Sequence, residues 1–234
     1  MSSIVDALTG DPWAAMRMVL GDPLHPGGRE ATAALLDRAG VEAGTRVLDV
    51  GCGSGGALEL ARERGAHAVG LDRNPDGETV VRGDLSSVPV RSGSQDVVLG
   101  ECVLCLAPDL GVALAETRRV LREGGRLAFS DVTVRGDPPD LPDALASALC
   151  LTGRRDRAAL VDSVEAAGYE VGDVRDHQDD LVAMRDEAAR RLDVDAILGM
   201  LGDRGRELQA GVERLDEAVE SGRVGYVSLV GHAV

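Results

Sequence analysis

Short apolar runs and amphipathic segments alternate along the chain from about residue 45 to its end. The apolar runs have the length and Val-rich character of buried strands, and the segments between them carry apolar residues at helical spacing. The predicted strands cover 45–50, 67–72, 78–84, 95–101, 126–134, 169–177 and the closing run "GRVGYVSLVGHAV". Predicted helices over 56–65, 109–125 and 156–168 separate them. This alternation predicts an α/β fold with a doubly wound, Rossmann-like sheet of seven strands.

Two helical segments are predicted outside this core alternation. Residues 1–43 are mainly helical, with turns such as "DPLHPGG" at 22–28, and are expected to form a lid or cap in front of the sheet. Residues 44–234 would form the sheet domain, with a long helical insertion at about 179–221 before the last strand. Within the domain, Gly65 is a stop for the first helix, while Asp109 is an N-cap and Gly124–Gly125 a stop for the second.

The composition agrees with this fold. The 234 residues include only four aromatic side chains, so the core must consist of Val, Leu, Ala and Ile. Such a core suits a parallel sheet that helices bury on both faces. A chain of this length is long enough for one α/β domain with a sizeable core.

The net charge and the length of the apolar runs argue against nucleic acid and a membrane as partners. A net charge of −15, with no dense basic patch, argues against nucleic-acid binding. No apolar run approaches the ~18 residues of a membrane span, and no basic region followed by an apolar stretch opens the sequence. We therefore expect a cytoplasmic protein with a small-molecule partner, in which four cysteines do not form a disulfide framework. The sequence does not indicate the oligomeric state.

The stretch "VLDVGCGSGG", Val47 to Gly56, fits two nucleotide-loop patterns. Its glycines satisfy G-x-G-x-x-G, typical of dinucleotide sites, and together with Asp49 they satisfy D-x-G-x-G-x-G. An acid two residues before the first glycine would repel a pyrophosphate at the helix N-terminus. A ligand that carries an ammonium and a sulfonium would tolerate it. The charge therefore favours S-adenosylmethionine (SAM) over NAD as the cofactor.

Two further acids follow predicted strands. Asp72 ends the second strand, where it can accept both ribose hydroxyls, as NAD enzymes also arrange. Asp84, in "RGDLSSVPV", follows the third strand, where its carboxylate can accept the adenine amino hydrogens. Asp72 alone does not distinguish the two cofactors.

The ordered stretches "VLDVGCGSGGALELARERGAHAVGLD", "VVRGDLSSVPV", "QDVVLGECVLCL" and "LAETRRVLREGGRLAFSDV" resemble the class I SAM-dependent methyltransferases over roughly 44–134. The resemblance implies that 44–234 is a SAM-binding methyltransferase domain. It implies a methionine site at the glycine loop, a ribose site at Asp72, an adenine site at Asp84 and an acid, Glu101, near the amino acid moiety. The implied cofactor-binding residues are Asp49, Gly51, Cys52, Gly53, Gly55, Asp72, Arg73, Gly83, Asp84, Leu85 and Glu101.

Within that superfamily, "GECVLCLAPD" and "LREGGRLAFSDV" are most similar to arsenite methyltransferases and their uncharacterised bacterial relatives. The resemblance implies that Cys102 and Cys150 hold a soft acceptor, arsenic(III) or a thiol, with Cys105 as a third thiolate. The arsenite enzymes also carry cysteines before the glycine loop, and residues 1–51 here have none. Each of the three cysteines could equally be a small core residue.

An oxygen or nitrogen acceptor would need a general base instead. His25 in the cap and Asp131 at the end of the fifth strand are the better candidates, and His177 is a third. No metal site is expected, because Cys102 and Cys105 have no second pair and the histidines lie far off in sequence.

We therefore predict a SAM-dependent methyltransferase of a small-molecule acceptor, with a soft nucleophile favoured. The alternatives are an O-, N- or C-methyltransferase of a natural product or metabolite, and a non-catalytic SAM-binding module that uses the 179–221 helices as a partner surface.

Overall fold

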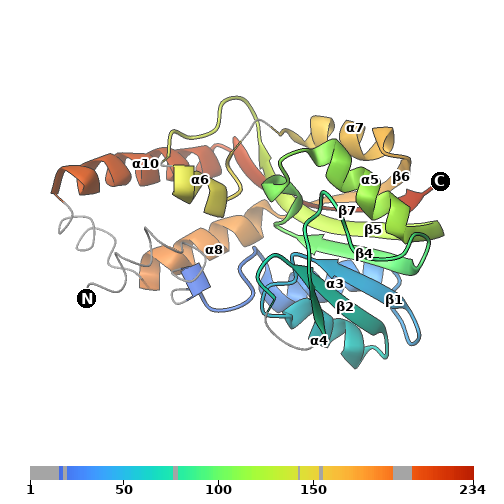
Figure 1. The fold of residues 1–234 in the computed structure, drawn as a ribbon. Helices are drawn as coiled ribbons and strands as arrows, with labels where there is room; N and C mark the ends of the chain where they lie inside the picture. The colour runs from blue at the N-terminus through green and yellow to red at the C-terminus, as the bar shows by residue number, and fades with distance from the viewer. Residues whose placement is uncertain (1–15, 18–19, 76–78, 142, 153–154, 192–201) are drawn as a thin grey trace.

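A central sheet of seven strands organises the computed structural model of the chain, which describes all residues except 1–15, 18–19, 76–78, 142, 153–154 and 192–201 (Figure 1). The strands are β1 (Arg46–Val50), β2 (His67–Asp72), β3 (Val80–Arg82), β4 (Gln95–Glu101), β5 (Leu121–Val134), β6 (Tyr169–Asp176) and β7 (Val224–Ala233). Their order is β3-β2-β1-β4-β5-β7-β6. The first five strands are parallel, and β7 is antiparallel to both β5 and β6. The predicted seven-stranded α/β fold is confirmed.

Helices cover both faces of the sheet. They are α3 (Gly28–Arg38), α4 (Gly56–Glu63), α5 (Leu110–Val120), α6 (Asp143–Ala148), α7 (Arg157–Ala166), α8 (Gln178–Arg191) and α10 (Gly202–Glu220), with a short 3₁₀ turn, η1, at Leu104–Leu106. Helices α5 and α7 pack on one face, and α3 and α4 on the other (Figure 1). The central strands are therefore buried on both sides, as their continuous apolar runs predicted.

The helix boundaries follow the local signals with one exception. Asp109 caps α5, because its carboxylate accepts a hydrogen bond from Val112 N at 3.1 Å. Gly65 lies just beyond α4 with a φ of 81°. The predicted stop at Gly124–Gly125 is wrong, since α5 ends at Val120 and the chain is already extended at Leu121, which pairs with Gln95 of β4.

The structure shows how the described parts of the two helical segments, 1–43 and 179–221, are arranged. Helix α3 contributes Leu35 and Leu36 to the core beside α4, so this part of the 1–43 segment is packed structure. The 179–221 insertion consists of two helices, α8 and α10, with 192–201 outside the described residues. Since α8 starts at Gln178 directly after β6, the insertion begins beside the sheet. None of the described helices combines the length and apolar character that a membrane span needs.

Candidate active site

The glycine loop presents backbone at the carboxyl end of β1. Gly51, Gly53 and Gly55 have φ values of 70°, 50° and 87°, in the left-handed region that glycine adopts most readily. A Cβ at Gly51 would clash with Val103, whereas a Cβ at Gly53 would meet no atom within 4 Å. The loop is thus packed against the protein at Gly51 and open at Gly53, which leaves the start of α4 accessible to a ligand.

Asp49 lies beneath this loop as a buried acid without a complete set of partners. Its side chain is 3% exposed, and Oδ2 has no hydrogen-bond partner among the described residues. Burial, and then the nearby carboxylates Glu101 and Asp72, raise its pKa well above the usual range. Burying an ionised carboxylate without a partner costs free energy, and a cation or a hydrogen-bond donor beside it lowers that cost. The loop therefore fits a positively charged ligand group.

Asp72 is fixed by the loop and remains able to bind a ligand. Its Oδ2 accepts a hydrogen bond from Gly53 N at 3.0 Å, and its Oδ1 accepts one from Asn74 N at 2.8 Å. Each carboxylate oxygen has a second lone pair. The two oxygens can therefore accept two neighbouring hydroxyls, which is the role predicted for this residue.

Asp84 is more fully occupied than the sequence suggested. It accepts hydrogen bonds from Ser86 N and Oγ and from Arg73 Nε, at 2.8, 2.6 and 2.6 Å. The Ser86 hydrogen bonds come first among the causes that lower its pKa to about 2. Gly83 packs closely under Leu71, and the Leu85 side chain is in the core, so these two residues could offer a ligand only backbone.

Cys52 also points away from the loop surface. Its thiol packs against Gly70 in the core beside α4, and burial raises its pKa to about 12. Only its backbone can take part in the predicted cofactor site.

Glu101 ends β4 in a buried polar cluster with two residues of the N-terminal region. Thr32 Oγ1 donates to its carboxylate at 3.0 Å, and His25 Nε2 lies 3.5 Å from Oε2. His25 Nδ1 lies 3.2 Å from Pro26 O, so this nitrogen carries a proton. Burial raises the pKa of Glu101, while His25 and the Thr32 hydrogen bond oppose that shift. The cluster is an acid–imidazole pair that can hold and transfer a proton.

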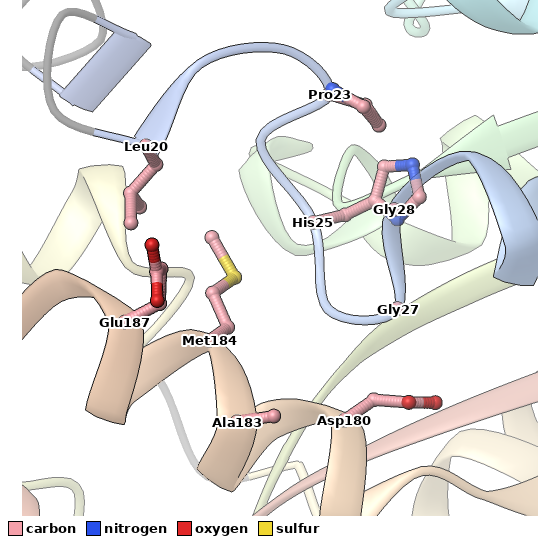
Figure 2. Close-up of a pocket in the computed structure, with 9 residues that line it drawn as sticks. All are labelled: Leu20, Pro23, His25, Gly27, Gly28, Asp180, Ala183, Met184 and Glu187. Atoms are coloured by element: carbon pink, nitrogen blue, oxygen red, sulfur yellow. The ribbon is translucent and has the colours of Figure 1, made fainter.

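His25 also lines a pocket of about 200 Å³ between the 20–28 segment and α8 (Figure 2). The pocket walls are Leu20, Pro23, His25, Gly27, Gly28, Asp180, Ala183, Met184 and Glu187. The sequence indicated His25 as a candidate base. It gave no signal for Thr32, Asp180 or Met184, because only folding brings α3 and α8 to the end of β4.

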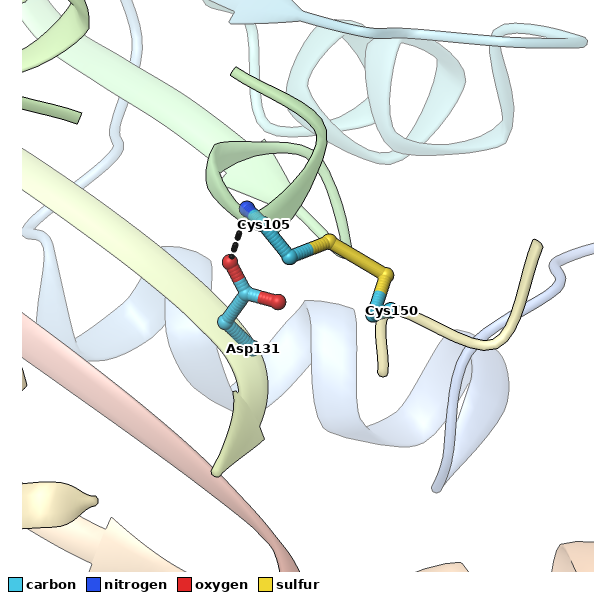
Figure 3. A group of neighbouring side chains, drawn as sticks. All are labelled: Cys105, Asp131 and Cys150. Atoms are coloured by element: carbon cyan, nitrogen blue, oxygen red, sulfur yellow. Dashed lines mark hydrogen bonds between the residues drawn. A yellow bond between two sulfur atoms is a disulfide. The ribbon is translucent and has the colours of Figure 1, made fainter. Parts of the chain in front are cut away.

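Two of the three late cysteines are bonded to each other, close to Asp131 (Figure 3). Cys105 and Cys150 form a disulfide, with their Cα atoms 5.5 Å apart. Cys102 is a free thiol whose Sγ lies 3.5 Å from Tyr226 Oη, and its backbone oxygen is 3.8 Å from Cys150 Sγ. The expectation of unpaired cysteines is wrong for this pair, since two residues 45 positions apart meet where η1 packs against the turn after α6.

These contacts reduce the reactivity expected of the cysteines. Burial, with the negative charge of Asp131, raises the pKa of the Cys102 thiol far above its usual range. The sulfurs of Cys105 and Cys150 are used in their bond, although with Asp131 they place three potential metal ligands within 4.8 Å. In the oxidised state neither sulfur is a thiolate.

The other two candidate bases, Asp131 and His177, are hydrogen-bonded within the protein and do not line the pocket. Asp131 is completely buried, accepts hydrogen bonds from Cys105 N and Val132 N, and has its pKa raised by burial to about 6. His177 lies between Asp180 and Ser228 at 2.9 and 2.8 Å. His25 is the candidate that both lines the pocket and contacts Glu101.

Comparison with known proteins agrees with this geometry. A family model described as "Methyltransferase domain" matches residues 48–129. The protein "Methyltransferase GfsG" of Streptomyces halstedii is 32% identical over 176 residues, covering 66% of this chain and 63% of that protein. "Arsenite methyltransferase" of Halobacterium salinarum is 33% identical over 162 residues, 58% of this chain and 40% of that protein. The chain thus spans less than two thirds of either relative.

The fold also matches solved structures. A putative sarcosine dimethylglycine methyltransferase from Galdieria sulphuraria superposes with a TM-score of 0.70 at 19% identity, covering 87% of this chain and 84% of that chain. At that identity the likeness concerns the fold alone.

Proposed function

We propose that this chain is a class I SAM-dependent methyltransferase, which binds SAM and transfers a methyl group to a small oxygen, nitrogen or carbon acceptor in the pocket beside His25. The observation that carries the proposal is Asp49, a buried carboxylate with a partnerless oxygen beneath an exposed glycine loop. The methionine end of SAM bears an ammonium and a sulfonium, which suit that oxygen.

The cofactor roles follow the carboxyl edge of the sheet. Gly51, Gly53 and Gly55 bring backbone close to the methionine moiety, with Asp49 below them and Glu101 at the next strand end. Asp72 accepts the ribose hydroxyls through its second lone pairs. Asp84 lies at the adenine end, where Arg73 already holds one of its oxygens. SAM supplies an electrophilic methyl group, and the chain supplies orientation and proton handling.

His25 is the proton acceptor in this proposal. An acceptor O–H, N–H or acidic C–H must lose its proton as the new bond to the methyl carbon forms. Nε2 of His25, which lies 3.1 Å from Thr32 Oγ1, takes that proton, and Glu101, 3.5 Å away, stabilises the imidazolium. The Pro26 carbonyl fixes the ring by accepting from Nδ1.

Two titrations and one variant test the proposal. Calorimetry with S-adenosylhomocysteine and with NADH should show binding of the former only, and binding of NADH alone would overturn the cofactor. With a panel of alcohols, amines and carbon acids, SAM turnover should be detectable as S-adenosylhomocysteine. His25→Gln should lower kcat by about 10²–10⁴ at unchanged cofactor affinity. Cofactor binding without turnover on any acceptor would favour the non-catalytic module.

A soft acceptor is the second candidate, and the convergence of three cysteines next to Glu101 favours it. It requires the reduced dithiol at Cys105 and Cys150. Mass spectrometry after incubation with SAM, arsenite and glutathione tests this candidate. Methylated arsenic that disappears in Cys102→Ser and in Cys150→Ser would support the thiolate site, and equal product from both variants would exclude it.

A further inference from the structure

One acid in the pocket has a side chain held in place and an oxygen with no partner. Asp180 is 43% exposed, and His177 Nδ1 lies 2.9 Å from its Oδ2. An ionised carboxylate only accepts hydrogen bonds, so Nδ1 donates to it in either charge state of the imidazole. Oδ1 of Asp180 has no hydrogen-bond partner in the described part of the chain. One oxygen is thus anchored, and the other is available to a ligand.

Further polar contacts connect His177 to the sheet. His177 Nε2 lies 2.8 Å from Ser228 Oγ, and that hydroxyl also accepts a hydrogen bond from Arg38 Nη1. Arg38 is in turn bound to the Asp173 backbone and carboxylate. Ser228 is 3% exposed on β7, which pairs with β5 and β6, so the row of polar groups is attached to a strand inside the sheet. His177 is a positioning residue for Asp180.

The two acids of α8 that line the pocket, Asp180 and Glu187, have different charged partners. Glu187 forms ion pairs with Arg190 and Arg191, so arginines neutralise it. Asp180 has only the imidazole of His177 as an ionic partner in the described residues. Glu101 adds a second negative charge behind His25. The end of the pocket at Asp180 therefore favours a positive group.

The remaining walls are apolar. Leu20, Pro23, Ala183 and Met184 line the pocket together with His25 and Asp180 (Figure 2). At about 200 Å³ the pocket has room for a small molecule. An acceptor can place its reacting atom at His25 and a second polar group at Asp180, with its apolar body between them.

We propose that Asp180 is a specificity residue that binds an ammonium group of the methyl acceptor, so that the substrate class is a small apolar amine whose amino group lies away from the methylated atom. This inference rests on the proposed function, because it places the reacting atom at His25. His177 holds one oxygen of the Asp180 carboxylate in place at the edge of the pocket.

The test uses the full-length protein saturated with S-adenosylhomocysteine, with n-hexylamine and 1-hexanol as probes in calorimetry. Hexylamine should bind more tightly than hexanol, and Asp180→Asn should weaken hexylamine by at least about tenfold with little effect on hexanol. Glu187→Gln is the matched control and should change hexylamine affinity by less than about threefold, since its acid is already paired. His177→Asn, which keeps a donor where Nδ1 lies, should retain binding that His177→Leu loses.

Several results would overturn the inference. These are equal affinity of wild type for the two probes, no hexylamine binding at all, or equal hexylamine binding by wild type and Asp180→Asn. The cofactor titration separates this failure from that of the proposed function. If S-adenosylhomocysteine binds and hexylamine does not, the methyltransferase stands and only the amine site is rejected.

Discussion

Replacing Asp49 by Asn should make the cofactor-free protein more stable and its cofactor binding weaker. The residue is 3% exposed, has one oxygen without a hydrogen-bond partner among the residues that the structure describes, and is close to two other acids. An unsatisfied buried group of this kind costs about 1–3 kcal/mol, more when it is charged. Since an amide is cheaper to bury than a carboxylate, Asp49→Asn should raise the Tm of the free protein by roughly 2–10 °C for a domain of this size.

The same substitution removes the charge that an ammonium or sulfonium would meet. Loss of one charge-assisted contact of about 2 kcal/mol corresponds to roughly 30-fold weaker SAM binding. Calorimetric affinity and thermal melts with and without cofactor measure both effects. Without cofactor, the gain in Tm should be larger at pH 8 than at pH 6. The folded-state pKa of Asp49 lies above its unfolded value, so the stability that its protonated form contributes is lost as pH rises through the folded pKa.

Asp96 is the matched control for this pair of effects. It is an acid at the other end of the sheet, bound by Arg46 and Arg122, which hold its pKa well below the usual range. Asp96→Asn should lower Tm and leave SAM affinity unchanged. An Asp49→Asn protein that melts below wild type without cofactor, or binds SAM as tightly as wild type, would refute the reasoning.

Three further predictions concern the loop, the disulfide and pH. The Cys105 disulfide closes a 45-residue separation, so Cys105→Ser or a reductant should cost about 2–4 kcal/mol of stability, while Cys102→Ser should not change the response to reductant. Thiol titration in denaturant should find two free thiols, and four would contradict the bond. Gly51→Ala should destabilise the free protein by about 1–3 kcal/mol, as seen by denaturant melts, because its Cβ clashes at positive φ. Compared with Gly51→Ala, Gly53→Ala should lower the free energy of unfolding less and should weaken S-adenosylhomocysteine binding more. That affinity should rise as the pH increases above the usual titration range of a glutamate, because burial raises the pKa of Glu101 and its charged form is the one that attracts an ammonium; an affinity that does not change with pH there would contradict the role of the acids.

The cofactor side could be predicted because its signals are local. Asp49 is the last but one residue of β1, and Asp72 and Glu101 are the last residues of β2 and β4. Because parallel strands end at one edge of a sheet, the three acids had to meet there. The methyltransferase family was predicted from these motifs, and a model of the methyltransferase domain matches residues 48–129. The role of each residue toward the cofactor stays a prediction, and the structure adds that Cys52 and Leu85 could act only through backbone.

The acceptor side could not be predicted because it is assembled from distant segments. His25 meets Glu101 across 76 positions of sequence, and Asp180 lies in a helix that no motif marks. The pairing of Cys105 with Cys150 likewise depends on how the turn after α6 returns to η1. The resemblance to arsenite methyltransferases implied that Cys102 and Cys150 act together, whereas in the structure Cys150 is bonded to Cys105 and the Cys102 thiol lies against Tyr226.

Reactivity at this edge depends on partners more than on residue type. Cysteine is the stronger nucleophile in isolation, yet burial and the charge of Asp131 keep the Cys102 thiol protonated. His25 lies beside the carboxylate of Glu101, its ring is held by the Pro26 carbonyl, and it lines the pocket. A proton leaving an acceptor therefore has a place to go at His25, whereas forming a thiolate at Cys102 would add a negative charge to a region that already holds Asp131 and Glu101. For that reason the proposed function has an acceptor that must be deprotonated, and a soft acceptor would first require reduction of the Cys105–Cys150 bond.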